Sequence, residues 1–147
     1  MFDDLVGQER AIGVLRTAAA AAAEIVAGGA GAGMTHAWLF TGPPGSGRTE
    51  AAKALAAALL CADQGCGACE SCHQVEVGSH PDLMWVRPEG LSYGIKQTRG
   101  LVLKAAGAPT LGRWRIVLFE DADRLTEEAA NALLKAIEEP PQRTVLL

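Results

Sequence analysis

Eight residues in the first third of the chain constrain its fold more than any other feature. The segment GPPGSGRT, from Gly42 to Thr49, follows a short apolar run, Ala37–Phe40, and precedes a helix expected over 48–60. This is the pattern G-x-x-x-x-G-[K/R]-T between a strand and a helix. Its glycines let backbone N–H groups converge on phosphate oxygens, and the helix N-terminus adds partial positive charge. The sequence therefore predicts a phosphate-binding loop that follows a buried strand.

The loop favours ATP and Mg²⁺ as ligands. Thr49 offers a hydroxyl to Mg²⁺, and a basic side chain meets the outer phosphates. That basic residue is Arg48, where the pattern has lysine, and its planar, forked guanidinium is not an equivalent replacement. Hydrolysis is therefore less expected than binding, and the alternative for this segment is a turn without a ligand. The residues expected to contact nucleotide are Gly42, Gly45, Ser46, Gly47, Arg48 and Thr49.

Apolar runs alternate with helical patterns along the rest of the chain. Thr126 can cap a helix that has Glu127 and Glu128 in its first turn and ends at Pro140. Strands alternating with helices predict an α/β fold, a parallel sheet with helices on both faces. The other expected elements are helices over 8–27 and 95–106 and strands over 83–86, 115–119 and from about 144.

The strand over 115–119 runs into two acids, Glu120 and Asp121. This resembles a Walker B segment, in which an aspartate holds Mg²⁺ and a following glutamate polarises the attacking water. Here the order is reversed, with Glu120 at the metal position and Asp121 at the base position. Each carboxylate is displaced by about a bond length, and a shift near 1 Å can cost about a hundredfold in rate. The acids are candidate catalytic residues with weak or no hydrolysis expected; alternatively, they are solvated acids at a strand end.

Four cysteines follow the spacing C-x4-C-x2-C-x2-C inside a Cys/Gly/His-rich stretch over 61–81 that shows no clear periodicity. In a reducing compartment this spacing favours metal binding over disulfides. Four thiolates suit a closed, structural, tetrahedral Zn²⁺ site. An iron–sulfur cluster is the competing metal centre, and His73 is an alternative to the last cysteine. The expected ligands of this inserted module are Cys61, Cys66, Cys69 and Cys72.

Composition and charge limit the partners. Hydrophobic residues make up 49% and charged residues 20% of the 147, which indicates a folded domain, and the net charge of -4 argues against a broad basic nucleic-acid surface. Lys96, Arg99 and Lys104 recur at roughly helical spacing, which fits a solvated helix face better than a DNA contact. The acidic start and the absence of a long apolar run predict a cytoplasmic protein without a membrane partner. The apolar end over 144–147 is expected to belong to a strand of a longer, C-terminally continued protein.

Taken together, these motifs resemble a known family, the AAA+ P-loop subunits of the bacterial DNA polymerase III clamp loader. The start FDDLVGQE resembles a box near the adenine pocket of that family, which implies that Val6 and Gly7 contact nucleotide. The string NALLKAIEEPP, over 131–141, resembles a signature of these subunits, and the cysteines lie where bacterial clamp loaders carry zinc. The resemblance implies one AAA+ nucleotide-binding core over 1–147, the N-terminal fragment of a longer chain, with a zinc module inserted over 61–81.

The resemblance also implies a function. Arg48 and the reversed Glu120-Asp121 pair are more similar to the delta-prime subunit than to the gamma/tau ATPase subunit. A delta-prime-like subunit would help ATP-dependent loading of the sliding clamp on primed DNA within the DNA polymerase III holoenzyme, with weak or absent ATPase activity of its own. Its partners would be the other subunits of the hetero-oligomeric ring. The alternatives are an active gamma/tau-type ATPase and, with little support, a small P-loop kinase.

Overall fold

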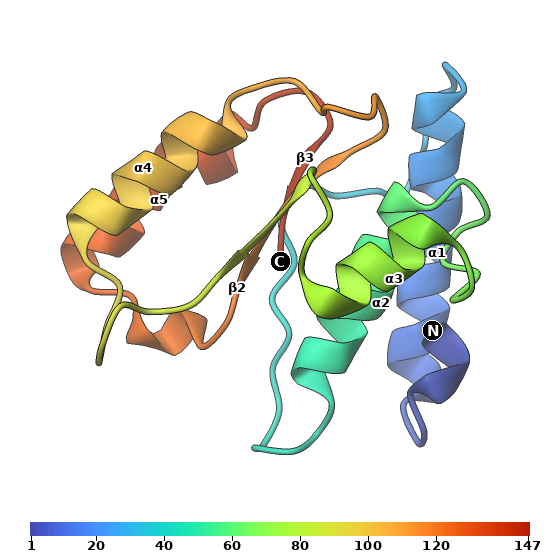
Figure 1. Cartoon of the computed structure of the whole chain (residues 1–147), viewed down its shortest axis with the longest axis horizontal. Coiled ribbons are helices and arrows are strands. Elements are labelled where there is room, and N and C mark those ends of the chain that lie inside the picture. The colour runs from blue at the N-terminus through green and yellow to red at the C-terminus, as the bar shows by residue number, and fades with distance from the viewer. The chain divides into compact units, whose positions relative to one another are not determined.

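The computed structural model describes residues 1–147, and the chain forms two compact units. The first comprises Met1–Thr35 and Leu39–Pro81, and the second comprises His36–Trp38 and Asp82–Leu147. In Figure 1 the helices of the first unit run from blue to green, and the helices of the second are yellow to orange-red. No helix is both long and apolar enough to span a lipid bilayer.

The first unit is helical. The short 3-10 helix η1 (Phe2–Asp4) precedes α1 (Glu9–Val26), α2 (Arg48–Leu60) and α3 (Glu70–Val77). Helix α2 is its centre, because α1 and α3 both pack against it and the α2 side chains are buried from Ala52 to Leu60. Alanine at six of the thirteen α2 positions lets the neighbouring helices approach closely at little cost in helix propensity.

A lysine joins α2 to α3. Lys53 is only 8% exposed, and its Nζ lies 3.1 Å from Glu76 Oε1 on α3 and 3.6 Å from Glu50 Oε1 on α2. A buried ammonium group needs such partners, because removing it from water without them is costly. Lys53 therefore links the position of α3 to that of α2.

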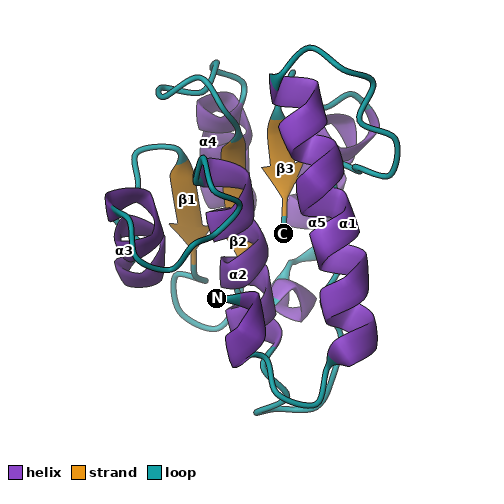
Figure 2. Ribbon diagram, turned by 90° about the vertical axis from the view of Figure 1, so that its right-hand side faces the viewer, coloured by secondary structure: helices purple, strands orange, loops and turns teal.

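The second unit is a three-stranded parallel sheet with two long helices. Its elements are β1 (Leu83–Val86), α4 (Ile95–Ala105), β2 (Arg115–Phe119), the 3-10 helix η2 (Ala122–Arg124), α5 (Glu127–Glu138) and β3 (Thr144–Leu146). The strand order is β1-β2-β3, with parallel pairing throughout, and Figure 2 shows β1 and β3 pointing the same way. Thr126 caps α5 as expected, since its Oγ1 accepts a hydrogen bond from Ala129 N at 3.2 Å.

One face of the sheet packs against α4 and α5. Alternate strand residues point to the same face. The buried cluster on this face takes a residue from each strand and combines them with residues of α4, α5 and the preceding loop: Val86, Tyr93, Ala105, Val117, Ala129 and Leu146. The central strand β2 is buried along its whole middle, over 116–118. This is the uninterrupted apolar pattern expected of a strand in a parallel sheet.

Most expected elements are confirmed within one residue, and the prediction of a buried strand over Ala37–Phe40 is wrong in part. Ala37 forms an isolated parallel bridge with Leu146, and Trp38 N donates to Leu146 O at 2.9 Å. Leu39 lies outside any strand and is 80% exposed. A parallel ladder needs a partner residue for every second residue. The pairing of this run with β3 is limited to the hydrogen bonds that Leu146 makes with His36 O and Trp38 N.

The stretch over 61–81 contains a helix that its composition does not reveal. Helix α3 occupies Glu70–Val77 and ends at Gly78, whose φ of 73° is the left-handed conformation favoured at a helix C-terminus. Its apolar face is short, with Cys72 and Val75 as its buried residues. Two buried positions in eight residues give little periodicity to read.

Tyr93 connects the carboxyl ends of β1 and β2 through hydrogen bonding to their backbone. Its side chain is fully buried, and the single proton of its hydroxyl is shared between two carbonyl oxygens, Val86 O at 2.9 Å and Glu120 O. The ring packs edge-to-face against Phe119 at 5.9 Å. Burial, reinforced by the negative charges of Asp121 and Glu120, raises the pKa of the phenol to about 12, so it stays a donor.

Replacing this phenol tests its contribution to stability. Tyr93→Phe keeps the ring contact but removes the one donor that two carbonyl oxygens share, which we expect to lower the free energy of unfolding by about 1–3 kcal/mol. Urea unfolding followed by circular dichroism measures the change, and Tyr93→Leu, which also loses the ring, should cost more. An unchanged urea midpoint for Tyr93→Phe would show that the hydroxyl does not hold the strand ends.

Candidate nucleotide and metal sites

The four cysteines meet at one point of the first unit. All four Sγ atoms lie within 4.8 Å of one another, with Cys61 Sγ at 3.8 Å from Cys66 Sγ and 3.5 Å from Cys69 Sγ. Four sulfurs bonded to Zn²⁺ at about 2.3 Å in a tetrahedron are separated by about 3.8 Å. The donor set therefore has nearly the size that tetrahedral Zn²⁺ requires, and these residues can bind such a metal.

The backbone around the cluster stabilises negative charge on sulfur. Asp63 N donates to Cys61 Sγ and Gly67 N donates to Cys72 Sγ, each at 3.3 Å. Burial opposes ionisation of Cys61, yet hydrogen bonds from three backbone N–H groups and from Cys69 outweigh it and lower the pKa of Cys61 to about 6. Burial and the neighbouring sulfurs raise the pKa of Cys72 to about 12. Without a metal the cluster thus concentrates one thiolate on Cys61, and a divalent cation would displace the proton of Cys72.

Secondary structure brings the ligands together. Cys61 follows the last residue of α2, while Cys69 and Cys72 lie at the start of α3. Glycine is favoured at position 65, because its φ is 84° and a Cβ there would lie in a tight contact, 3.2 Å from Ala58 N. His73 is exposed and lies outside the cluster, so the structure brings together the all-cysteine set.

The phosphate loop lines a cavity of the first unit. The cavity measures about 390 Å³, within the usual range for small-molecule sites. Gly45 and Gly47 have φ of 78° and 81°, and Gly47 O accepts the Ala51 N–H that opens α2. The loop residues in its wall are Thr41, Gly42, Pro43, Ser46, Gly47 and Arg48.

Ser46 contributes the most informative atom of this cavity. Its Oγ is buried and has no hydrogen-bond partner. A Cβ at position 42 would lie 2.5 Å from that Oγ, so Gly42 provides the space in which the Ser46 hydroxyl sits. A buried hydroxyl without a partner is costly, and a polar ligand in the cavity would satisfy it. The residues present therefore fit a phosphate-bearing ligand.

The other expected nucleotide contacts are placed differently. Arg48 lines the cavity and makes no ion pair, whereas Thr49 is half-buried outside its lining. Val6 and Gly7 are exposed, and the neighbouring Leu5 and Gln8 line the cavity instead. Leu5 directly follows η1 and is buried, as is Phe2 within η1. The spacing of these two apolar residues was the sequence signal from which the burial of Leu5 could have been predicted.

Glu120, in the second unit, is already bound by other side chains. Its Oε2 accepts hydrogen bonds from Arg87 Nε at 2.7 Å and from Trp85 Nε1 at 3.1 Å. The Arg87 guanidinium also lies over the Trp85 ring, 4.7 Å from its centroid. Sequence reasoning missed both partners. Their signal is the W-x-R spacing at the end of β1, which directs both side chains to one face of the sheet.

Asp121 turns away from a regular strand. Its φ of 54° is left-handed, and it begins η2. Its Oδ2 lies 3.7 Å from Arg124 Nε, with both side chains nearly half-exposed, so this ion pair contributes little. Both candidate catalytic acids therefore face an arginine of their own unit.

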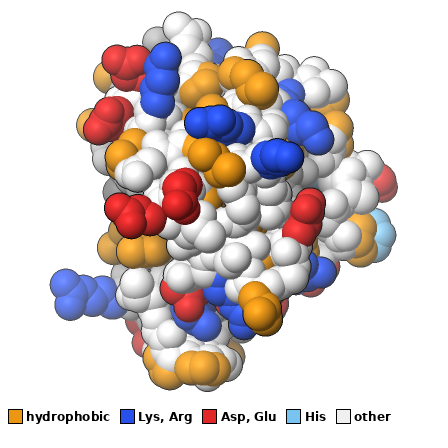
Figure 3. Space-filling model, turned by 90° about the vertical axis from the view of Figure 1, so that its left-hand side faces the viewer, with side chains coloured by type: hydrophobic (Ala, Val, Ile, Leu, Met, Phe, Trp, Pro, Cys, Tyr) orange, Lys and Arg blue, Asp and Glu red, His pale blue; other side chains and the backbone are white.

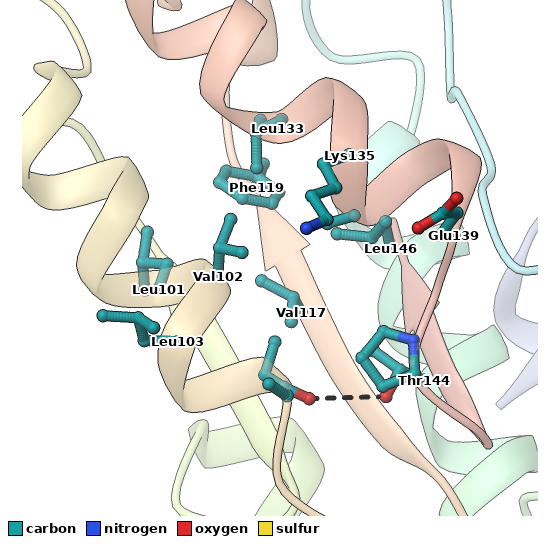
Figure 4. Close-up of a pocket in the computed structure, with 14 residues that line it drawn as sticks. Leu101, Val102, Leu103, Val117, Phe119, Leu133, Lys135, Glu139, Thr144 and Leu146 are labelled. Carbon is teal, nitrogen blue, oxygen red and sulfur yellow. Dashed lines mark hydrogen bonds between the residues drawn. The ribbon is translucent and has the colours of Figure 1, made fainter.

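A second cavity, of about 340 Å³, lies between α4 and α5 (Figure 4). Leu101, Val102 and Leu133 point toward it from the two helices, and Val117 from β2 forms part of its floor. Lys135 and Glu139 are the charged residues in its lining, which holds no metal-ligand set or nucleophile. This groove is apolar, and the candidate chemistry lies at the two sites of the first unit.

The fold and these sites define an α/β protein with a parallel sheet, a phosphate loop and a four-cysteine cluster. Residues 20–147 match the model of the family described as DNA polymerase III, delta subunit. The chain is 36% identical over 115 residues to the DNA polymerase III subunit delta' of Bacillus subtilis, covering 76% of this chain and 35% of that protein. It is 42% identical over 118 residues to the delta' subunit of Pseudomonas aeruginosa, covering 76% and 36%.

The gamma/tau subunit of Mycobacterium tuberculosis is also similar, at 35% identity over 152 residues, covering 99% of this chain and 24% of that protein. A solved structure of a DNA polymerase III gamma subunit-related protein from Thermotoga maritima matches 44% of this chain and 22% of its own, at 38% identity and a TM-score of 0.42. By the family match, this chain belongs to the DNA polymerase III delta-subunit family. It spans about a third of the length of the delta' relatives.

Proposed function

We propose that this chain is the nucleotide-binding part of a delta-prime-type clamp-loader subunit. In this proposal it helps ATP-dependent loading of the sliding clamp on primed DNA within the DNA polymerase III holoenzyme. The observation that carries the proposal is the phosphate-loop cavity, with the unpartnered Ser46 hydroxyl in its wall, in a member of this family. ATP would bind there through the backbone N–H groups of the loop and the Arg48 side chain.

The subunit's own hydrolysis of ATP would be weak or absent. Arg48 replaces the lysine that the loop pattern contains, and Glu120 and Asp121 stand in reversed order. In addition, the Glu120 carboxylate is hydrogen-bonded to Arg87 and Trp85 rather than free. A bound Mg²⁺ would supply charge neutralisation for the phosphates, and Thr49 remains the residue proposed to approach it.

Zinc is the metal proposed for the four cysteines, in a structural role over 61–81. The size of the sulfur cluster and its four protein ligands support a closed site without an open coordination position. A site of this kind would fix α3 against the end of α2. Iron–sulfur binding is the alternative that metal analysis distinguishes.

The proposed partners are the other clamp-loader subunits, with the sliding clamp and primed DNA reached within the assembly, in the cytoplasm. On α4, Lys96, Arg99 and Lys104 are exposed and make no ion pair. Figure 3 shows several Lys and Arg side chains close together, with hydrophobic ones between them, on the side where α4 and α5 are drawn. Such a face suits either solvent or the DNA backbone within the assembly.

An active ATPase of the gamma/tau type is the second candidate. The observation in its favour is the match to a gamma/tau subunit over 99% of this chain. The delta-prime and gamma/tau proposals both include ATP binding and differ in whether the subunit hydrolyses ATP.

Calorimetry with ATP, followed by a turnover assay, tests the proposal on the full-length subunit. We expect ATP to bind with a Kd in the micromolar range or weaker, with turnover at least about a hundredfold below the median enzyme rate of about 10 s⁻¹. Gly42→Val should abolish binding by filling the space beside Ser46. Turnover by the isolated subunit that disappears in Glu120→Gln or Asp121→Asn would instead support the gamma/tau type.

A further inference from the structure

The cavity between α4 and α5, which we call the α4–α5 groove, reaches down to the sheet (Figure 4). Its floor includes Val117 and Phe119 of β2 and Leu146 of β3, so the two helices leave part of this sheet face uncovered. The volume is about 340 Å³, at the lower end of the range for ligand sites. A helix is about 10 Å across and rises about 5.4 Å in a turn, so the groove has room for a few side chains and not for a helical turn.

Small side chains keep the groove open. Ala105 and Ala106 at the end of α4 and Ala136 of α5 line it, and they leave space that larger apolar residues would fill. At one end, Thr144 Oγ1 donates to Ala105 O at 3.5 Å, which joins the end of α4 to β3. Leu103, also in the lining, is 77% exposed. Such apolar surface is typical of a place where a partner binds.

The charges beside the groove favour an acidic partner. Lys135, in the α5 wall, makes no ion pair, and Figure 4 shows its ammonium group directed into the space between Val102 and Leu146. Glu139 is the one acidic residue of the lining, and it lies at the C-terminal end of α5. An ammonium group above apolar side chains gains a charge-assisted hydrogen bond if a carboxylate comes within reach. The other wall adds positive charge, because α4 has no acidic residue and three basic ones: Lys96, Arg99 and Lys104.

We propose that the α4–α5 groove binds a short segment of a partner protein in which two apolar side chains are flanked by acidic residues. The apolar side chains fill the groove against Val117 and Phe119, and a carboxylate faces Lys135. Duplex DNA matches this surface less well, because it offers phosphates to the basic side chains but no apolar side chain to the groove. The proposal concerns the second unit alone and does not depend on nucleotide binding.

Fluorescence anisotropy with labelled peptides and the full-length subunit tests the proposal. The probe is the hexapeptide EELLEE. One control peptide, KKLLKK, has the opposite charge, and the other, EESSEE, lacks the apolar side chains. We expect EELLEE to bind saturably with a Kd below about 1 mM, and each control peptide to bind at least about tenfold more weakly, which is about 1.4 kcal/mol.

Variants of the groove locate the binding. Ala106→Phe places a ring in the groove from an exposed position, and Lys135→Glu reverses the charge of one wall, so each should weaken EELLEE binding at least about tenfold. Lys135→Glu should also bind KKLLKK more tightly than wild type does, a gain that unfolding cannot produce. Two matched controls should keep the wild-type affinity for EELLEE within about twofold: Lys135→Arg, which retains the charge, and Leu91→Ser, at an exposed apolar residue outside the lining.

Three results would overturn the proposal. The first is an absence of saturable EELLEE binding by the full-length subunit. The second is a control peptide that binds as tightly as EELLEE, since the acidic or the apolar part of the partner would then be unnecessary. The third is an Ala106→Phe variant with the wild-type affinity, which would place the peptide elsewhere. If duplex DNA also displaces the peptide in that case, the basic face binds nucleic acid instead.

Discussion

If the four cysteines hold zinc as proposed, removing the metal is expected to unfold the segment from Cys61 to α3 and to destabilise the first unit. Helix α3 contributes two buried residues, Cys72 and Val75, and its other link to α2 is the Lys53–Glu76 contact. So small an apolar contact cannot offset the conformational entropy of ordering about twenty residues. Because a structural metal couples its binding energy to folding, we expect a loss of about 3 kcal/mol or more and a melting temperature lower by about 6–12 °C.

Metal analysis and thermal unfolding on the same sample measure this effect. Cys61→Ser should lose the metal and melt earlier, whereas His73→Ser, which changes the exposed neighbour of Cys72, should keep both the metal and the melting temperature. Acidification should also release the metal, since protons compete for the thiolates. Full stability of a metal-free sample, or a brown sample containing iron, would contradict the structural zinc site.

Replacing Asp82 is expected to cause the largest loss of stability in the second unit. Asp82 is 1% exposed, and its two carboxylate oxygens accept hydrogen bonds from Thr110 N at 2.5 Å and Leu111 N at 2.8 Å. Arg115 Nη2 lies 3.5 Å from Oδ1. Asp82→Asn turns one acceptor into a donor that faces an N–H group, and it leaves Arg115 without its counter-charge. We expect a loss of about 3 kcal/mol.

The same contacts predict how stability depends on pH. Burial opposes ionisation of Asp82, but the hydrogen bonds from Leu111 and Thr110 and the charge of Arg115 outweigh it and lower the pKa of the carboxyl. A group with a lowered folded-state pKa stabilises the protein fully above its unfolded pKa of about 3.9. That contribution is lost as the pH falls through the lower folded-state value.

Urea unfolding at neutral pH and near pH 3 measures both effects. The wild type should lose stability on acidification, and Asp82→Asn should lose less, because it has no carboxyl group to protonate at this site. Asp123→Asn, at an exposed position, is the control and should follow the wild type. An equal acid-induced loss in wild type and Asp82→Asn would assign the pH dependence to other groups.

Local sequence predicts the elements of this fold well wherever a single segment contains the whole signal. Helix α2 begins at Arg48 because Gly47 can adopt the left-handed conformation before it, and Thr126 caps α5 through its own hydroxyl. The four cysteines converge because their spacing and the glycines between them leave few other loop conformations. These signals act over a few residues, so they are readable in the sequence.

Signals that depend on a distant partner are not readable in this way. The apolar run over 37–40 looks like a strand, but pairing with β3 is a long-range contact, and within the run it involves only Ala37 and Trp38. Val6 and Gly7 fit a motif, yet Leu5 and Gln8 line the cavity, and ligand binding at any of these residues stays a prediction. The division into a nucleotide-binding core with an inserted module over 61–81 also stays a prediction.

By itself, the sequence determined the phosphate loop, the cysteine cluster and the parallel α/β order, because each follows from local spacing and periodicity. The tertiary structure alone decided what surrounds Glu120. Trp85 and Arg87 lie more than thirty residues before Glu120, and only the register of β1 beside β2 places all three on one face. Pairing between strands is a long-range interaction, so the partner of a carboxylate is fixed by the fold and not by its neighbours in the chain.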